Sequence, residues 1–257
     1  MYQRLSSNYD RFNNWKDRLA FEMPFIDKQL RNPKGEPGDR FSILDAACGT
    51  GMHAITLAKG GHQISGADLV PEMIEIAQEN ANSAGVTVDF RAVGFGSLNK
   101  EFGPCRFNAV LCLGNSLPHL LSREDVLDAL SDFNQCLLPG GMLLIQNRNF
   151  DSIMQQKNRW MEPQVFKEND KEWLFQRFYD FEANGTIRFN IVTLSRTLEA
   201  DWQMSINHTL LRPLLYEDLS GLLSISGFSS IKSFGDMTGN TFDPDLSPNL
   251  IIVTKKT

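Results

Sequence analysis

The chain has 257 residues, of which 42% are hydrophobic and 22% charged, a composition typical of a globular protein with a sizeable core. Its net charge of −6 and its pI near 5.3 argue against nucleic-acid binding. The sequence contains no apolar run of membrane-spanning length and no signal-peptide core near its start. We therefore expect a cytoplasmic protein with neither a nucleic-acid nor a membrane partner.

The four cysteines and four histidines are scattered along the chain, without a C-x-x-C pair or the spacing of a zinc site. We expect the cysteines to be reduced, buried side chains, and we expect no metal site.

A helical N-terminal arm, residues 1–40, ends in the turn-rich stretch RNPKGEPGDR, and a strand–helix alternation begins after it. The alternation predicts a parallel sheet with helices on both faces. Pro71 suits the first turn of a helix, and Ser122 with Asp125 forms a capping-box pattern. LPGG at 138–141 predicts a turn. The expected strands are 41–46, 62–68, 86–93, 107–114 and 142–147, and the expected helices are 52–59, 71–83 and 122–137.

The pattern changes after the fifth strand to alternating apolar and polar residues, with Ala183-Asn184-Gly185 as a hairpin signal. This predicts an antiparallel β insertion over 156–212, in which most aromatic residues pack the sheet. A helix at 216–226 and strands at 229–235 and 249–256 follow. The loop before the last strand is too short for a crossover helix, so we expect that strand to be antiparallel.

The most informative stretch is DAACGTGMHA, residues 45–54, a glycine-rich turn between a strand and a helix. It fits the G-x-G-x-x-G/A pattern of a dinucleotide site, in which backbone N–H groups approach the ligand. Asp45 would repel a pyrophosphate but suits the ammonium and sulfonium of S-adenosylmethionine (SAM); a turn or capping aspartate is the alternative. Asp68, 17 residues after Gly51, suits the two ribose hydroxyls of either cofactor, or lies in a surface turn.

Residues 43–78 resemble the first half of a class I SAM-dependent methyltransferase. CLGNSLPHL (112–120), LLPGGMLLIQNRNFDSIM (137–154) and YDRFNNWKDRL (9–19) resemble the glycine N-methyltransferase group, which includes glycine/sarcosine methyltransferases. The resemblance covers about 9–154. It implies a doubly wound, Rossmann-like, seven-stranded sheet with its last strand antiparallel, built from 41–155 and 213–257. The arm and the insertion would close over SAM, whose product is S-adenosylhomocysteine. Oligomeric state stays open.

The resemblance also implies roles for individual residues. Trp15 and Arg18 would lie over the cofactor, Asp68 would hold its ribose, and Leu69 and Met73 would lie near its adenine. Leu113, Gly114 and Asn115 would line the methyl-transfer channel, with Ser116 and His119 beside them. Asp45, Ala47, Cys48, Gly49 and Gly51 would bind the cofactor at the glycine turn. The stretch AVGFGSL after the third strand departs from the family, because Gly94 and Phe95 offer backbone groups and an aromatic wall where an acidic residue is usual.

For the methyl acceptor, Arg148 matches the family arginine that holds a carboxylate, and its guanidinium suits a bidentate grip. A salt bridge to Asp151 is the alternative. Asn115 would share the carboxylate, and Tyr9 or Tyr179 would orient an amine. His119 is either a general base or a packed histidine.

The expected reaction is in-line methyl transfer from SAM to a small, carboxylate-bearing amine such as glycine or sarcosine, driven mainly by orientation. The alternatives are a hydroxyl, thiol or macromolecular acceptor, or a non-catalytic SAM-binding protein. Methyltransferases that act on a nucleic-acid base or a protein amide carry an N-P-P-Y/F motif after the fourth strand. This chain has GNSL (114–117) in that place, which argues against both acceptors.

Overall fold

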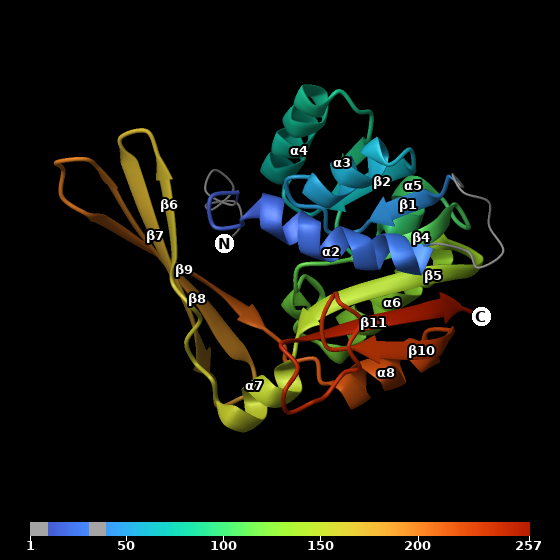
Figure 1. The fold of residues 1–257 in the computed structure, drawn as a ribbon. Helices are drawn as coiled ribbons and strands as arrows, with labels where there is room; N and C mark the ends of the chain where they lie inside the picture. The colour runs from blue at the N-terminus through green and yellow to red at the C-terminus, as the bar shows by residue number, and fades with distance from the viewer. Residues whose placement is uncertain (1–9, 31–39) are drawn as a thin grey trace.

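The structure is a computed structural model that describes residues 10–30 and 40–257. Its main feature is a seven-stranded sheet in the order β10-β11-β5-β4-β1-β2-β3, in which only β11 runs against its neighbours (Figure 1). This confirms the expected doubly wound sheet with an antiparallel last strand. The strands are β1 (Ser42–Asp45), β2 (Gln63–Asp68), β3 (Asp89–Ala92), β4 (Phe107–Cys112), β5 (Leu137–Arg148), β10 (Phe228–Phe234) and β11 (Asn249–Lys256).

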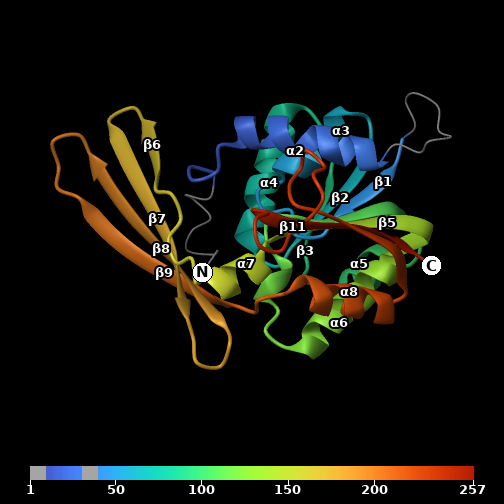
Figure 2. The same ribbon diagram turned by 60° about the horizontal axis from the view of Figure 1, so that its bottom comes forward.

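Helices cover both faces of this sheet, as Figures 1 and 2 show. On one face lie α2 (Trp15–Leu30), α3 (Met52–Lys59) and α4 (Pro71–Ala84); on the other lie α5 (Leu98–Phe102), α6 (Arg123–Cys136) and α8 (Tyr216–Ile225). The central strands β1, β4 and β5 therefore send alternate side chains into two apolar layers. Leu44 and Ile145 pack under α6 and α8, whereas Ile43 and Leu144 pack under α2 and α3.

The local signals in the sequence place most helix ends. Pro71 occupies the first turn of α4, and the Ser122 hydroxyl accepts a hydrogen bond from the Asp125 N–H at the start of α6. The prediction of a turn at 138–141 is wrong, because these residues belong to β5. They form a bulge: Phe107 pairs with Leu137 and Ala109 with Met142, so that five positions of β5 extend beside two of β4.

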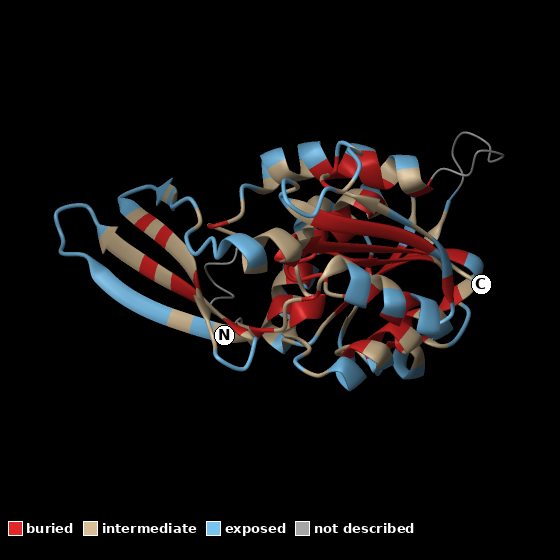
Figure 3. Cartoon of the chain, turned by 90° about the horizontal axis from the view of Figure 1, so that it is seen from below, coloured by how far each residue is buried: buried red, intermediate tan, exposed pale blue. Residues whose placement is uncertain are grey.

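The insertion forms a separate four-stranded antiparallel sheet that projects from the body (Figures 1 and 3). Its strands are β6 (Gln164–Glu168), β7 (Lys171–Phe181), β8 (Ile187–Thr197) and β9 (Gln203–Leu211), and the expected hairpin turn lies between β7 and β8. Sequence analysis missed β6 and the preceding helix α7 (Phe150–Gln156). Phe150 packs with Tyr179 and Ile187, which joins the insertion to the end of β5.

The segment before α2 also contacts the insertion. The rings of Phe12 and Phe175 lie 5.6 Å apart, and the Arg11 guanidinium lies 4.5 Å from the centre of the Trp173 ring. Arg11 also pairs with Glu168 at 3.4 Å. These contacts bring the arm and the insertion together beside the carboxyl ends of the strands. No helix in the described ranges is long and apolar enough to cross a membrane.

One buried carboxylate fixes the segment after β3. Asp132 of α6 is 5% exposed, and its two oxygens accept hydrogen bonds from the N–H groups of Leu98 (2.8 Å) and Asn99 (2.7 Å). These are N–H groups that the first turn of α5 cannot pair itself. Asp132 therefore caps α5 from a different helix and anchors the loop at 93–97.

Replacing Asp132 with alanine should leave both N–H groups unpaired and destabilise the protein by about 1–3 kcal/mol. We expect the melting temperature to fall by several degrees, since about 2–4 °C accompany each kcal/mol in a chain of this size. Thermal unfolding of D132A measures this loss of stability. The control is D128A, which removes an exposed aspartate one turn earlier in α6. Equal melting temperatures for the two variants would contradict the capping role.

Candidate active site

Two cavities open at the carboxyl ends of the parallel strands, the edge at which doubly wound sheets bind ligands. The first, of about 570 Å³, lies above β1 and β2, and the second, of about 420 Å³, lies between α2, the end of β5 and the insertion. Gly114, just after β4, lines both cavities. A ligand in one cavity therefore faces a ligand in the other across this residue.

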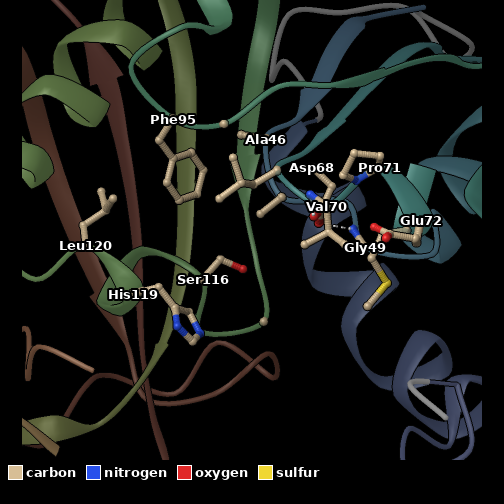
Figure 4. A pocket seen from close by; sticks show the side chains of 15 residues that line it. Ala46, Gly49, Asp68, Val70, Pro71, Glu72, Phe95, Ser116, His119 and Leu120 are labelled. Atoms are coloured by element: carbon tan, nitrogen blue, oxygen red, sulfur yellow. Dashed lines mark hydrogen bonds between the residues drawn. The ribbon is translucent and has the colours of Figure 1, made fainter. Parts of the chain in front are cut away.

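The first cavity gathers most of the expected cofactor residues. Figure 4 shows two walls: Gly49, Asp68, Val70 and Glu72 on one side, and Phe95, Leu120 and His119 on the other. Sequence analysis missed the apolar positions Ala46, Val70, Pro71 and Leu120, as well as Glu72. The expected residues that line this cavity are Ala47, Gly49, Asp68, Leu69, Met73, Gly94, Phe95, Gly114, Ser116 and His119.

Cys48 and Gly51 shape the glycine turn from behind the cavity wall. Gly51 has φ +82°, and a Cβ atom there would stand 2.8 Å from a ring carbon of Phe90. The position therefore requires glycine for its conformation and for its space. Cys48 is buried, and its N–H donates to the Ala67 carbonyl at 2.8 Å, which ties the turn to β2. Leu113 packs in the core under α2 and does not line the channel.

Asp45 ends β1 beneath the glycine turn, and only 1% of it is exposed. Neither carboxylate oxygen has a side-chain hydrogen-bonding partner among the described residues. Burial raises the pKa of Asp45 to about 6, although the charge of His53 and the nearby backbone N–H of Ala47 oppose this. A buried, unpaired carboxylate beside a glycine-rich turn suits a cationic ligand group.

Asp68 ends β2 and is fixed by the backbone. Its oxygens accept hydrogen bonds from the N–H groups of Gly49 (2.9 Å) and Val70 (3.0 Å). Burial raises its pKa, and these two hydrogen bonds offset part of the shift. A carboxylate has about four acceptor sites, so two remain for a pair of hydroxyl groups on a ligand.

His119 ends a short 3₁₀ helix, η1 (Leu117–His119), and faces the first cavity (Figure 4). Burial lowers its pKa to about 4, so its imidazole is neutral at physiological pH. Such a weak base favours the packed role over general-base catalysis.

The second cavity brings Asn115 and Arg148 together from adjacent strand ends. The Asn115 Oδ1 accepts a hydrogen bond from the Arg148 backbone N–H at 2.9 Å. The Arg148 guanidinium has no ion pair within the part of the chain described here, and Asp151 instead accepts from the Tyr216 N–H at 3.0 Å. The salt bridge considered as an alternative is therefore absent among these residues.

The insertion contributes further polar groups to this cavity, among them Arg177 and Tyr179 of β7. Burial raises the pKa of the Tyr179 hydroxyl, and the nearby charges of Arg148 and Arg177 offset part of the shift. Sequence analysis missed Arg177. It occupies one position in the alternating apolar and polar pattern of β7, and that pattern does not distinguish a site residue from any other polar residue of the sheet. Tyr9, the other tyrosine considered for the amine, lies outside the described residues.

The two expected arm residues are fixed near the boundary between the cavities. Arg18 lines the second cavity, and its guanidinium lies 5.0 Å from the centre of the Trp15 ring. Trp15 itself lines neither cavity; its ring stands edge-on to His53 at 5.6 Å. The Trp15 Nε1 and the Thr50 hydroxyl both donate to Asp10 at 2.7 Å, which links the arm to the glycine turn.

The site also contains a buried pair that sequence analysis missed, Glu22 of α2 and Gln146 of β5. The Glu22 Oε2 lies 2.6 Å from His53 Nε2 and 3.1 Å from Arg18 Nε, and its Oε1 accepts from Gln146 Nε2 at 2.8 Å. Burial alone would raise the pKa of Glu22, but these partners lower it to about 2. Two features of the sequence could have pointed to this pair: the i,i+4 spacing of Arg18 and Glu22, and the single glutamine, Gln146, at the end of an apolar run.

A protein-family model described as a methyltransferase domain matches residues 43–141. The chain is 28% identical to a glycine/sarcosine N-methyltransferase of Parasynechococcus marenigrum over 93% of this chain and 79% of the relative. It is 27% identical to a glycine/sarcosine N-methyltransferase of Halorhodospira halochloris over 92% of this chain and 82% of the relative.

Solved structures share the fold. A SAM-dependent methyltransferase from Clostridium acetobutylicum matches with a TM-score of 0.75 and 16% identity over 99% of this chain and 98% of that one. A SAM-bound amino pentose methyltransferase from Micromonospora echinaspora matches with a TM-score of 0.72 and 18% identity over 100% of this chain and 98% of that one.

The first cavity fits SAM chemically, because it combines apolar walls with the carboxylate of Asp68. Asp45 does not line this cavity; its carboxylate is buried behind the glycine turn, next to the lining residue Ala46. Among the described residues, no group of three or more His, Cys, Asp or Glu side chains is placed to hold a metal ion. A methyltransferase domain covers residues 43–141, and sequence relatives, fold and site chemistry agree on a SAM-dependent methyltransferase that is similar to the glycine/sarcosine N-methyltransferases.

Proposed function

We propose that this enzyme methylates the amine nitrogen of glycine, sarcosine or a related amino acid. The observation that carries the proposal is the position of Arg148, whose guanidinium has no carboxylate partner in the described ranges, in a cavity that meets the cofactor cavity at Gly114. The names of the glycine/sarcosine N-methyltransferase relatives support the same class of acceptor.

In the cofactor cavity, Asp45 lies on the side of the glycine turn and would face the cationic methionine part of SAM. Asp68 would accept hydrogen bonds from the ribose hydroxyls. Leu69 is 75% exposed although it lines the cavity, so an adenine ring lying between it and Phe95 would bury both. When bound, SAM supplies a methyl group on an electrophilic sulfonium.

In the acceptor cavity, Arg148 would hold the acceptor carboxylate with two parallel hydrogen bonds. The Asn115 Oδ1 is already bound to the Arg148 N–H, so its Nδ2 is the group left to donate to the same carboxylate. This grip directs the amine toward Gly114. The free-base nitrogen then forms a bond to the methyl carbon as the carbon–sulfur bond breaks, and the product ammonium loses its proton to water. Holding these atoms in line supplies most of the catalysis.

The acceptor cavity, at about 420 Å³, is large enough for ligands well above the size of glycine. Phe12, Phe189 and Ile191 give it apolar walls. Amino acids with larger side chains therefore belong in any search for the acceptor.

The proposal is tested by calorimetric titration with SAM and S-adenosylhomocysteine, followed by methyl-transfer assays. The amine panel contains glycine, sarcosine, dimethylglycine and larger amino acids, and glycolate tests a hydroxyl of the same size. We expect micromolar cofactor binding and turnover of at least one amine. Turnover of glycolate alone, or of none of the carboxylate-bearing compounds, would refute the proposed acceptor class.

R148A should raise the KM for the amine about 10- to 100-fold, because charge-assisted hydrogen bonds contribute about 1.5–3 kcal/mol. SAM affinity should be unchanged, since Arg148 lies outside the cofactor cavity. R188A is the matched control: this arginine of β8 pairs with Glu182 at 2.7 Å and does not line the cavity. An unchanged KM in R148A would remove Arg148 from the acceptor site.

SAM affinity should weaken as the pH falls from 7 to 5. The raised pKa of Asp45, about 6, means that the free protein takes up a proton in this range. A bound cation keeps the carboxylate ionised, so the complex binds fewer protons and Kd rises by up to about tenfold per pH unit below 6. Glu22, with a pKa of about 2, stays ionised throughout, and His119, with a pKa of about 4, stays largely neutral.

Calorimetric Kd values for SAM between pH 5 and 7 measure this effect, with D45N as the control. D45N should bind SAM weakly and with little dependence on pH. A slope that persists in D45N would assign the titration to Asp68, whose pKa is also raised.

A further inference from the structure

The turn between the two cavities is held by one residue of the neighbouring strand, Gln146. Its side-chain Oε1 accepts a hydrogen bond from the Gly114 N–H at 3.1 Å, and its backbone carbonyl accepts from the Asn115 N–H at 3.0 Å. Both N–H groups of the turn are therefore fixed by the same residue.

This turn needs such support because of its backbone conformation. Gly114 and Asn115 have φ values of +72° and +66° in succession. A residue other than glycine is uncommon in the left-handed region, although asparagine tolerates it better than most, and such a conformation persists when surrounding contacts over-determine it. The Asn115 side chain is fixed as well, through the Arg148 N–H.

The orientation of the Gln146 amide is set in turn by Glu22. Because the Glu22 Oε1 accepts from the Gln146 Nε2 at 2.8 Å, the amide must present its oxygen to Gly114. Glu22 is 5% exposed, and its other oxygen is held by His53 of α3 and Arg18 of α2. A continuous chain of hydrogen bonds thus joins the helix after the glycine turn to the wall of the acceptor cavity.

We propose that Gln146 and Glu22 are positioning residues for methyl transfer, which align the acceptor amine with the methyl group by fixing the turn at Gly114–Asn115. The inference rests on the proposed function, because the turn bears on the reaction only if the acceptor lies in the second cavity. A residue needed only for packing in this part of β5 would be apolar, as Leu144 and Ile145 are. Gln146 instead forms hydrogen bonds with Glu22, Gly114 and Asn115, and together these contacts specify one orientation of the turn.

The first test compares Q146M with T254V. Methionine keeps the volume of glutamine but neither pairs with Glu22 nor accepts from Gly114. Thr254 of β11 is a buried control, 1% exposed, whose hydroxyl donates to the Ser229 carbonyl at 2.7 Å. We expect kcat of Q146M to fall about 10- to 100-fold, the effect of a misalignment approaching 1 Å, while the SAM Kd and amine KM change less than threefold. T254V should lose thermal stability and keep its kcat.

The second test exchanges the two groups. Q146E alone sets a carboxylate against Glu22 and should lower kcat at least as much as Q146M. The double variant E22Q/Q146E restores a donor and an acceptor with their roles reversed, and its kcat should exceed that of Q146E at least fivefold. A double variant no more active than Q146E would overturn the inference, as would a Q146M enzyme with wild-type kcat.

Hydrogen–deuterium exchange of the peptide covering 111–117 gives a readout without an acceptor. Exchange at Gly114 and Asn115 should be faster in Q146M than in the wild type, and unchanged in T254V. If the wild-type enzyme methylates no amine in the panel, the proposed function fails, and unchanged exchange in Q146M would overturn the inference separately.

Discussion

The site depends on how the chain leaves β4. After Cys112 the backbone must turn across the edge of the sheet without filling the space where two ligands would meet. Two left-handed residues in succession, Gly114 and Asn115, achieve this within two positions. Gly114 carries no side chain between the cavities, and Asn115 directs its amide toward Arg148. The strand order, which places β5 beside β4, supplies the residues that hold this conformation.

Two buried carboxylates near this turn differ in whether side chains of the protein pair with their charge. Glu22 and Asp45 are 5% and 1% exposed. Glu22 has side-chain partners on both oxygens and a pKa lowered to about 2, whereas Asp45 has no side-chain hydrogen-bonding partner in the described residues and a pKa raised to about 6. The first charge is stable in the free protein; the second is costly there and is relieved by a cation. Pairing within the fold, more than burial, distinguishes the two roles.

Most of the body of the fold follows from local patterns, because short apolar runs such as FNAVLCLG, set between turn signals and helical patterns, favour a strand buried on both faces. Asp45, Asp68 and the glycine turn were also predictable, since a strand end and a helix start fix them within one segment. Glu22 and Gln146 were not, because their contact joins residues 124 positions apart and depends on α2 packing beside β5. The bulge at 138–141 escaped for a related reason: Pro and Gly signal a turn, and only the pairing of Phe107 with Leu137 extends the strand across them.

The distribution of charge over the two cavities matches the two partners of an amine methylation. Asp68 lines the cofactor cavity with Asp45 buried beside it, so a cation is favoured there. The acceptor cavity contains Arg148 and Arg177. Of its two carboxylates, Glu22 is held by Arg18 and His53, and Asp17 accepts a hydrogen bond from the Asn14 side chain. Negative and positive fields therefore meet at Gly114. In the proposed reaction, an acceptor with a carboxylate and a neutral amine would be drawn in by its carboxylate, which would leave the amine as the end nearest the sulfonium. The positive charges of Arg148, Arg177 and the sulfonium would disfavour an ammonium at that point, which would favour the free amine that reacts.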